Sequence, residues 1–450
     1  MANLGANLGA NLGVGPVRAG ERVGALDVLR GVAVCGILLM NIPLMGWSAL
    51  RPQHPTGKPL LDADWISFSL QKLVFEGSMR GLFTLLFGAG MLIMLRSLDG
   101  DATRPPAQAY FTRCFALMLL GVAQFALFLW PGEILFNYGV TGLALFLFRR
   151  AQVRVLLTAA AALLITMSVA IGVPGLKRAE MLEKAEVAAA LQAAKTPLTD
   201  EQTKALEAKK EFLEKVHPKP AALAEERAKR TSFPGVLTWS TAFWADFNLT
   251  GESVAYLGES LAFMLLGMAL FRLDVLGGAR PLGFYLLLAA GGYGLGLLVR
   301  VPIHLIQWQA GFESTPTTAA LGGFAYEAGR LPTTLGLLGL VLTLHKLRAL
   351  GPLEGALKAI GRLALTNYTL ESALTSILFY GLGWYERFTF GGLMAVCAGV
   401  WVVLGVFSVL WLRRWEMGPA EWLLRSLTYG RWQPLGRARP MGVTAAAPAE

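Results

Sequence analysis

Two glutamates lie inside strongly apolar stretches of the sequence, where a charge is least tolerated and therefore most informative. Glu259 and Glu371 each stand several residues within such a stretch, with no basic residue at helical spacing. A charge at the centre of a membrane helix costs about 3 kcal/mol on insertion scales, so each glutamate needs a partner or a proton. The candidate partners on other segments are Arg80, Arg300, Arg330, Gln124, Asn137 and Asn367. The pattern indicates a functional polar cavity, a structural clamp, or the protonatable group of a proton-coupled transporter.

Five pairs of polar residues stand three or four positions apart, a spacing that places both side chains on one face of a helix. These pairs are Asp27 with Arg30, Glu76 with Arg80, Arg300 with His304, Glu327 with Arg330, and Glu421 with Arg425. Charges near the end of a membrane helix reach water at little cost and need no function. We therefore favour a structural role for the Glu327 and Glu421 pairs.

The four histidines of the chain are His54, His217, His304 and His345. His54 follows the first apolar stretch, in the loop Arg51-Pro-Gln-His-Pro, where it could serve as a general base acting on a hydroxyl or an amine. A lone loop histidine is more often inert. His304 is expected to pair with Glu313 or to line a cavity, and the other two suit surface positions. No histidine spacing predicts a metal site, and no Gly-X-Ser-X-Gly motif predicts a serine nucleophile.

The composition of the 450-residue chain excludes an ordinary soluble enzyme and predicts a membrane protein. Apolar residues make up 54% of the chain, charged residues only 16%, and the mean hydropathy is +0.51. The sequence has neither the alternation of a β-barrel nor a glycine-rich nucleotide-binding loop. We predict an all-α polytopic bundle. The net charge of +10 has a membrane explanation, so no nucleic-acid partner is expected.

About ten stretches approach the 20 apolar residues that a helix needs to cross a bilayer. They are 31–50, 72–95, 114–132, 133–148, 155–173, 253–271, 281–299, 331–345, 363–385 and 388–412. Ten spans put both ends of the chain on one side. On that side the short segments carry 20 Lys and Arg residues, against 5 in the opposite loops. Both termini are therefore predicted to be cytoplasmic.

The composition also divides the chain into regions. Residues 1–20 are low-complexity and expected to be disordered, and residues 21–173 form a first membrane half of five helices. Residues 174–232, with 12 basic and 10 acidic side chains, are predicted to form a charged helical insert outside the cell. Residues 233–412 form a second half of five helices that begins with an interfacial aromatic segment. Residues 413–450 are predicted to be a basic amphipathic cytoplasmic tail.

Several short motifs carry a family resemblance. They are Asp27-Val-Leu-Arg30-Gly31, Met40-Asn41, Glu76-Gly77, Arg80 to Gly90, Gly361-Arg362, Thr366-Asn367-Tyr368 and Gly418-Pro-Ala-Glu421. Together they resemble the YeiB-like family of bacterial inner-membrane proteins, whose shared domain has no assigned function. The resemblance implies a multi-pass protein of the bacterial inner (plasma) membrane. Ser78 departs from the family pattern, in which a lysine is expected.

The opening motif is also similar, more remotely, to the start of the transmembrane acyltransferase superfamily. The similarity rests on Asp27, Arg30 and Asn41 and covers only about the first 90 residues. Those enzymes carry an acyl group from cytosolic acyl-CoA to an acceptor across the membrane and use a histidine after the first helix. His54 falls in the corresponding loop, which the resemblance implies as the catalytic position.

We therefore hypothesise transfer of an acyl group from cytosolic acyl-CoA or acetyl-CoA to an extracytoplasmic, small-molecule or lipid-linked acceptor. His54 is the candidate catalytic base. The candidate residues of a substrate site or polar cavity are Asp27, Arg30, Asn41, Glu76, Arg80, Asn137, Glu259, Arg300, His304, Arg362, Asn367 and Glu371. Two other classes stay open: a transporter or lipid flippase that uses intramembrane carboxylates, and a noncatalytic membrane scaffold. Membrane lipids and a second copy of the chain are the expected partners.

Overall fold

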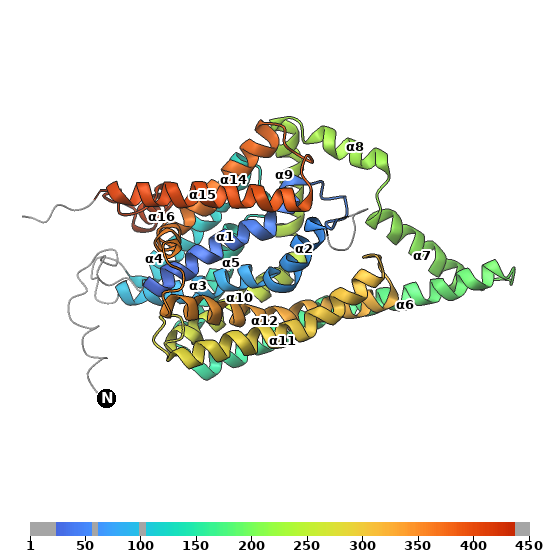
Figure 1. Ribbon diagram of the computed structural model, residues 1–450, viewed down its shortest axis with the longest axis horizontal. Helices are drawn as coiled ribbons and strands as arrows, with labels where there is room; N and C mark the ends of the chain where they lie inside the picture. The colour runs from blue at the N-terminus through green and yellow to red at the C-terminus, as the bar shows by residue number, and fades with distance from the viewer. Residues whose placement is uncertain (1–23, 56–61, 99–104, 437–450) are drawn as a thin grey trace, which may run out of the picture.

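The computed structural model describes residues 24–55, 62–98 and 105–436. The low-complexity segment 1–20 and residues 437–450 of the basic tail lie outside the described residues. Apart from one isolated bridge between Trp415 and Gly436, the described part of the chain has no β-structure. The all-α prediction is confirmed (Figure 1).

The helices comprise long membrane-sized elements and shorter ones between them. They are α1 (Gly24–Gly46), α2 (Ala63–Leu70), the π-helix η2 (Gln71–Phe75), α3 (Ser78–Leu98), α4 (Pro106–Phe128), α5 (Leu135–Leu145), η3 (Phe146–Phe148), α6 (Val153–Ala193), α7 (Asp200–Val216), α8 (Pro220–Lys229), α9 (Phe233–Leu249), α10 (Glu252–Arg272), α11 (Leu282–Gln309), α12 (Pro316–Lys346), α13 (Leu353–Arg362), α14 (Ala364–Ser376), η4 (Ile377–Gly381), α15 (Phe390–Arg414) and α16 (Pro419–Tyr429).

Seven helical stretches among the described residues are long and apolar enough to cross a membrane. Six of them are the single helices α1, α4, α6, α10, α11 and α15. The seventh is the run formed by α2, η2 and α3. The other three predicted spans correspond to the short α5, to the C-terminal half of the 31-residue α12, and to α14 with η4. The chain is therefore a helical membrane protein, while the count of ten and the sidedness of the termini stay predictions.

The helix α1 lies inside the bundle and packs against α3, α13, α14 and α15. Its contact with α13 is as close as two helices allow, because a Cβ on Gly31 would stand 2.1 Å from the Leu357 carbonyl oxygen, and one on Gly361 would stand 1.8 Å from that of Asp27. Small residues permit such backbone approach in membranes. The N-terminal motif around Gly31 thus meets the C-terminal motif around Gly361.

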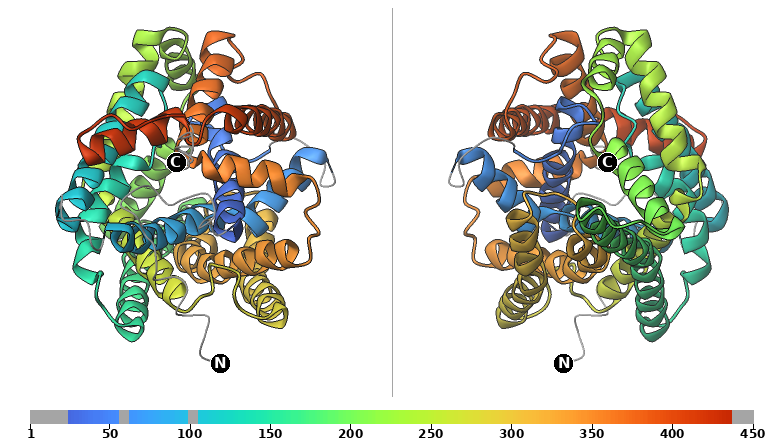
Figure 2. Two further views of the ribbon diagram at one scale, coloured as in Figure 1. Left: turned by 90° about the vertical axis from the view of Figure 1, so that its left-hand side faces the viewer. Right: turned by 90° about the vertical axis from the view of Figure 1, so that its right-hand side faces the viewer.

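The helix α6 runs without interruption for 41 residues, through Pro174 and into the charged insert. The predicted boundary at residue 174 therefore falls inside a helix. The insert continues with α7, whose N-terminus is closed by a capping box of Thr199 and Gln202, and with α8. Figure 1 shows α7 and the end of α6 projecting from the bundle, and the end-on views of Figure 2 show α6 and α11 at its periphery.

The aromatic helix α9 was predicted to lie at the membrane surface, and part of its aromatic face packs against the bundle instead. Trp244 is buried, stacks on Phe125 with ring centres 4.7 Å apart, and donates a hydrogen bond to Glu133 over 3.0 Å. Burial of the indole N–H against a carboxylate explains why this aromatic side chain turns inward.

Candidate functional site

Four charged side chains from three helices meet inside the bundle, and we call Arg80, Glu259, Glu327 and Arg330 the charged cluster. The Arg80 Nη2 atom lies 2.6 Å from both carboxylate oxygens of Glu259, and Arg330 forms a second ion pair with Glu259. Arg330 also contacts Glu327 over 3.4 Å. Glu259 thus binds two of the three arginines that its position in an apolar helix predicted as partners.

The charged cluster is buried and supported by aromatic rings. The side chains of Glu259 and Arg330 are 5% and 1% exposed, which leaves little water to screen their interaction. The Arg80 guanidinium lies 4.2 Å from the ring centre of Tyr256, and that of Arg330 lies 4.5 Å from the ring centre of Phe263. Two positive and two negative charges balance, so the cluster can persist inside a membrane protein.

The helix is broken between η2 and α3, and the break provides backbone carbonyls that bind Arg300 and Arg330. Gly77 has φ +70°, so the chain turns and leaves backbone carbonyls near the break without helical partners. Arg300 donates to the carbonyls of Leu73 and Glu76 over 3.1 and 2.6 Å, and Arg330 Nε donates to that of Gly77 over 3.2 Å. Arg300 therefore stabilises the break and makes no ion pair with Glu259.

The same break corrects one of the predicted pairs. Glu76 pairs with Lys72 over 2.5 Å, on its N-terminal side, while Arg80 points to Glu259. The four-residue spacing of Glu76 and Arg80 assumed a continuous helix, whereas the chain turns at Gly77 between them.

The expected pairing of His304 with Glu313 is also wrong. His304 Nε2 lies 3.0 Å from the Ser69 hydroxyl, on the face of α11 that packs against η2 and α2. Glu313 instead pairs with His217 of the insert, with 2.8 Å between Nε2 and Oε2. Because His217 lies at the end of α7, that contact joins the insert to the turn between α11 and α12.

His54 belongs to an aromatic cluster formed by His54, Trp65, Phe68, His304, Trp308 and Phe312. Its ring stacks on that of Phe312 with centres 4.9 Å apart and on that of Trp65 at 6.1 Å. The His54 Nδ1 atom lies 3.1 Å from the carbonyl oxygen of Pro55. Phe312 takes a left-handed backbone conformation with φ +62°, a strained geometry for a residue with a side chain.

Glu371 is the predicted site residue whose surroundings differ most from the expectation. It is 2% exposed, and its Oε1 atom has no hydrogen-bond partner among the described residues. On the neighbouring α4, Gln124 Nε2 donates to Ser372 over 3.0 Å, so the amide reaches the next residue of α14. The charged cluster does not include Glu371.

The predicted amides are tied into hydrogen bonds between helices. Asn367 donates to the Ile360 carbonyl over 3.1 Å and to Ser408 over 2.8 Å. Asn137 accepts from Ser260 of α10 over 2.8 Å. Both amides therefore join helices, while Asn41 is half-buried on α1.

The end of the bundle where α1 begins gathers arginines. Arg30 pairs with Asp27 over 3.3 Å, as its spacing predicts, and its guanidinium repels that of Arg113. Arg362 ends α13, which packs against this part of α1. Glu421 of α16 accepts hydrogen bonds from the backbone nitrogens of Leu365 and Thr366 over 2.7 and 3.2 Å.

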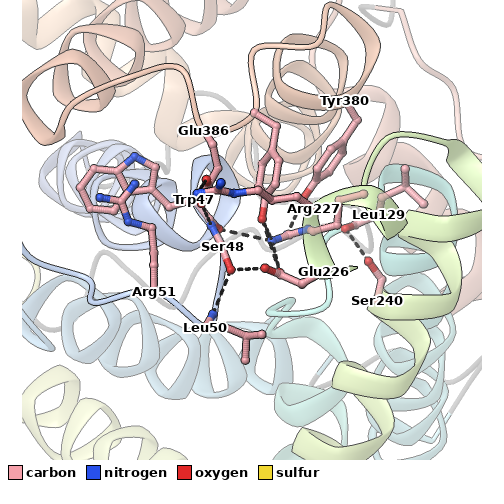
Figure 3. Close-up of polar contacts among 12 residues, drawn as sticks. Trp47, Ser48, Leu50, Arg51, Leu129, Glu226, Arg227, Ser240, Tyr380 and Glu386 are labelled. Atoms are coloured by element: carbon pink, nitrogen blue, oxygen red, sulfur yellow. Dashed lines mark hydrogen bonds and ion pairs between the residues drawn. The ribbon is translucent and has the colours of Figure 1, made fainter. Parts of the chain in front are cut away.

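A further polar cluster was not predicted. It joins the insert to the end of α1 and to the loop after η4, and we call Ser48, Glu226, Arg230, Tyr380, Tyr385 and Glu386 the insert cluster. Arg230 is 1% exposed and donates to the hydroxyls of Tyr380 and Tyr385, both over 2.6 Å. Figure 3 shows Glu226 facing Ser48, to which it is hydrogen-bonded.

The insert cluster was missed because its residues resemble the exposed charges around them. Arg227 forms an ion pair with Glu386, and Arg230 also lies 3.7 Å from the ring centre of Trp239. The one signal in the sequence was the position of Arg230 directly before the aromatic α9, where a guanidinium finds rings to stack on.

The geometry brings six of the predicted site residues together in three pairs. Arg80 and Glu259 meet in the charged cluster, His54 and His304 share the aromatic cluster, and Asp27 and Arg30 meet at the start of α1. Glu371 remains separate. The charged cluster can neutralise or hold a polar group, and the aromatic cluster presents two imidazoles, those of His54 and His304.

Comparison with known protein families gives a match in the C-terminal part of the chain. Residues 270–431 match the family model described as "Protein of unknown function (DUF418)". This segment holds Arg300, Glu327, Arg330, Glu371 and Glu421, but neither Arg80, Glu259 nor His54. No solved structure matches the chain.

Two relatives align over nearly the whole chain. "Uncharacterized protein YxaH" of Bacillus subtilis (strain 168) is 29% identical over 437 residues, which covers 94% of this chain and 98% of the relative. "Uncharacterized protein YeiB" of Escherichia coli (strain K12) is 29% identical over 410 residues, which covers 91% and 96%. The chain is thus a membrane protein that is similar over nearly its whole length to YxaH and YeiB and that matches the DUF418 model over residues 270–431, which supports the resemblance to the YeiB-like family.

Proposed function

We propose that this membrane protein is an acyltransferase that carries an acyl group from cytosolic acyl-CoA to an acceptor on the outer side of the bacterial inner membrane. The observation that supports this function is the hydrogen bond of the His54 ring. A carbonyl oxygen can only accept, so the Nδ1 atom 3.1 Å from the Pro55 oxygen carries the ring proton. The Nε2 atom of the neutral ring then keeps its lone pair and can act as a general base.

In the proposed reaction His54 Nε2 takes the proton from an acceptor hydroxyl or amine. The acceptor oxygen or nitrogen attacks the thioester carbonyl carbon, the carbon–sulfur bond breaks, and the CoA thiolate takes up a proton. Stacking on Trp65 and Phe312 holds the imidazole plane in place, which orients the lone pair toward the acceptor.

The arginines at the start of α1 are the proposed site for the CoA phosphates. Arg30 keeps 31% of its side chain exposed, and it lies near Arg113 with Asp27 as its acidic partner. Guanidinium groups suit phosphate oxygens because they donate in a planar fork. Arg362, at the end of the adjacent α13, is proposed to complete the site.

The two proposed ends of the reaction are far apart along α1. At about 1.5 Å per residue, the 16 residues from Arg30 to Gly46 correspond to about 24 Å. The thioester end of the bound acyl-CoA would therefore extend through the bundle interior to His54, past the polar groups of Glu371, Gln124 and the charged cluster.

The test is acyl transfer by the full chain in lipid vesicles supplied with labelled acetyl-CoA. Replacing His54 with Ala is expected to abolish transfer, because removal of a general base typically costs 10²–10⁴-fold in rate. His217→Ala is the matched control, since His217 is half-exposed outside the aromatic cluster and should leave the rate unchanged. Full activity of a folded His54→Ala variant would contradict the proposal.

One observation bears on the alternative of a proton-coupled transporter. Two arginines hold Glu259, so the charged cluster suits a fixed clamp better than a group that gains and loses a proton. Of the two carboxyls on which that alternative depends, only Glu371 is free of such partners among the described residues. Substrate-driven transport without acyl transfer would favour a transporter.

A further inference from the structure

Glu371 is a deeply buried carboxyl without a cation. It lies on α14, is 2% exposed, and forms no ion pair within residues 24–55, 62–98 and 105–436. Its Oε1 atom has no hydrogen-bond partner in the same part of the chain. A carboxylate that is both desolvated and unpaired is among the least stable groups that a protein interior can hold.

The helices around Glu371 present neutral groups. The titratable groups that sense its charge are the thiols of Cys35 on α1 and Cys397 on α15 and the hydroxyl of Tyr368 on α14. The helix α4 presents Gln124, which bonds Ser372. Arg362 ends α13, and the chain leaves helical geometry at Leu363 before α14 begins.

The helix α16 presents Glu421 to the N-terminal end of α14. Glu421 binds the backbone at Leu365 and Thr366, more than one helical turn before Glu371. The thiols, the hydroxyl and the amide around Glu371 offer no positive charge that could replace the lost hydration of a carboxylate.

We propose that Glu371 is an intramembrane proton-binding site, which holds a proton as a neutral carboxylic acid while buried and releases it when water reaches the contact between α4 and α14. The proton turns one carboxylate oxygen into a hydrogen-bond donor. On α4 the Gln124 Oε1 atom is a buried acceptor that lacks a partner in the described part of the chain. The same Gln124 amide donates to Ser372, the residue next to Glu371, so this unpartnered acceptor lies where α4 packs on α14.

Other buried carboxyls of the chain show why Glu371 is distinct. Glu259 accepts from arginine, Glu133 accepts from Trp244 and from the backbone nitrogens of Leu135 and Phe136, and Glu421 accepts from backbone nitrogens and Thr366. Each of these carboxylates has donors that stabilise its negative charge. The inference does not depend on acyl transfer, because it concerns the protonation of one side chain whatever the protein moves.

Infrared spectroscopy of the purified full-length protein in lipid tests the site directly, since a protonated carboxyl and a carboxylate absorb separately. At neutral pH the wild-type protein is expected to show a protonated-carboxyl band that shifts in D2O and is lost in Glu371→Gln. Glu259→Gln is the matched control and should leave this band in place. An unchanged band in Glu371→Gln would overturn the proposal.

Two further measurements keep the test decisive if a variant expresses poorly. Gln124→Leu removes the orphan acceptor and is expected to shift the band without abolishing it, whereas no shift of any carboxyl band would count against the site. Glu371→Gln should keep the wild-type melting temperature, because an amide replaces a neutral acid. A marked loss of thermal stability in this variant, with no carboxyl band lost, would mean that Glu371 is ionised.

Discussion

Two buried arginines, Arg330 in the bundle and Arg230 at the end of the insert, are equally hidden from water but are stabilised by different chemistry. Both side chains are at most 1% exposed. Arg330 contacts the carboxylates of Glu259 and Glu327 and one carbonyl. Arg230 has a single carboxylate, Glu226, and otherwise bonds to phenol hydroxyls, a carbonyl and the face of Trp239.

Arg330 is therefore held mainly by opposite charges, and Arg230 mainly by uncharged groups. Removing Arg330 leaves two carboxylates without their shared cation, whereas removing Arg230 leaves mainly uncharged hydroxyls that can find other partners. Burial alone therefore does not predict how much an arginine stabilises a protein; the charge of its partners decides.

The largest effect is expected for Arg330→Met. The variant should lose roughly 3 to 5 kcal/mol of stability, because buried ion pairs are broken and Arg80 alone then faces the two acids Glu259 and Glu327. Thermal unfolding in detergent micelles measures the loss, and Arg413→Met, at an exposed position on α15, serves as the control.

Combining Arg330→Met with Glu327→Gln sharpens the same comparison. The double variant should recover part of the stability, because Glu327, whose ion-pair partner Arg330 is gone, no longer carries a charge, while Glu259 keeps Arg80. An Arg330→Met protein as stable as the wild type would show that the charged cluster does not hold the bundle together.

A smaller effect is expected for Arg230→Met. Loss of hydrogen bonds to Tyr380, Tyr385 and the Trp47 carbonyl should cost about 1 to 3 kcal/mol locally. Limited proteolysis should then cut the insert faster, while the neighbouring exposed Lys229→Met should not change the rate. Equal protection of both variants would argue against the insert cluster as the anchor.

The smallest effect belongs to a solvent-exposed pair within the insert. The Lys184 ammonium holds the pKa of the Glu201 carboxyl below its ordinary value of 4.5. A depressed pKa stabilises the folded form above the ordinary value, and this contribution disappears as the pH falls through the lowered one. The hydrogen-exchange protection factors of α7, taken relative to the intrinsic rate at each pH, should therefore fall slightly on acidification, and Glu201→Gln should remove that dependence.

The sequence predicted contacts where a buried charge requires a partner or where regular helical spacing places two residues side by side. Glu259 needed a cation from another helix, and two of its three candidate arginines contact it. Asp27 and Arg30 pair because the start of α1 is a regular helix, which makes spacing a reliable guide.

The sequence did not predict contacts that depend on a local break in a helix or on segments that are distant in the chain. The turn at Gly77 invalidated the four-residue spacing of Glu76 and Arg80, and no composition signal marks a π-helix in advance. Arg230 stands among exposed lysines and arginines, and apart from its position before the aromatic α9 the sequence does not set it apart from them. His304 and Glu313 were close in sequence, yet each found a partner from a distant segment.

The uninterrupted α6 has a mechanical consequence. Its 41 residues form a rod on the order of 60 Å long, with one part among the membrane helices and the other in the insert. A small change in tilt at the buried part becomes a large sweep at the far tip, so a fluorophore on that tip would read out movements within the lipid as an amplified displacement.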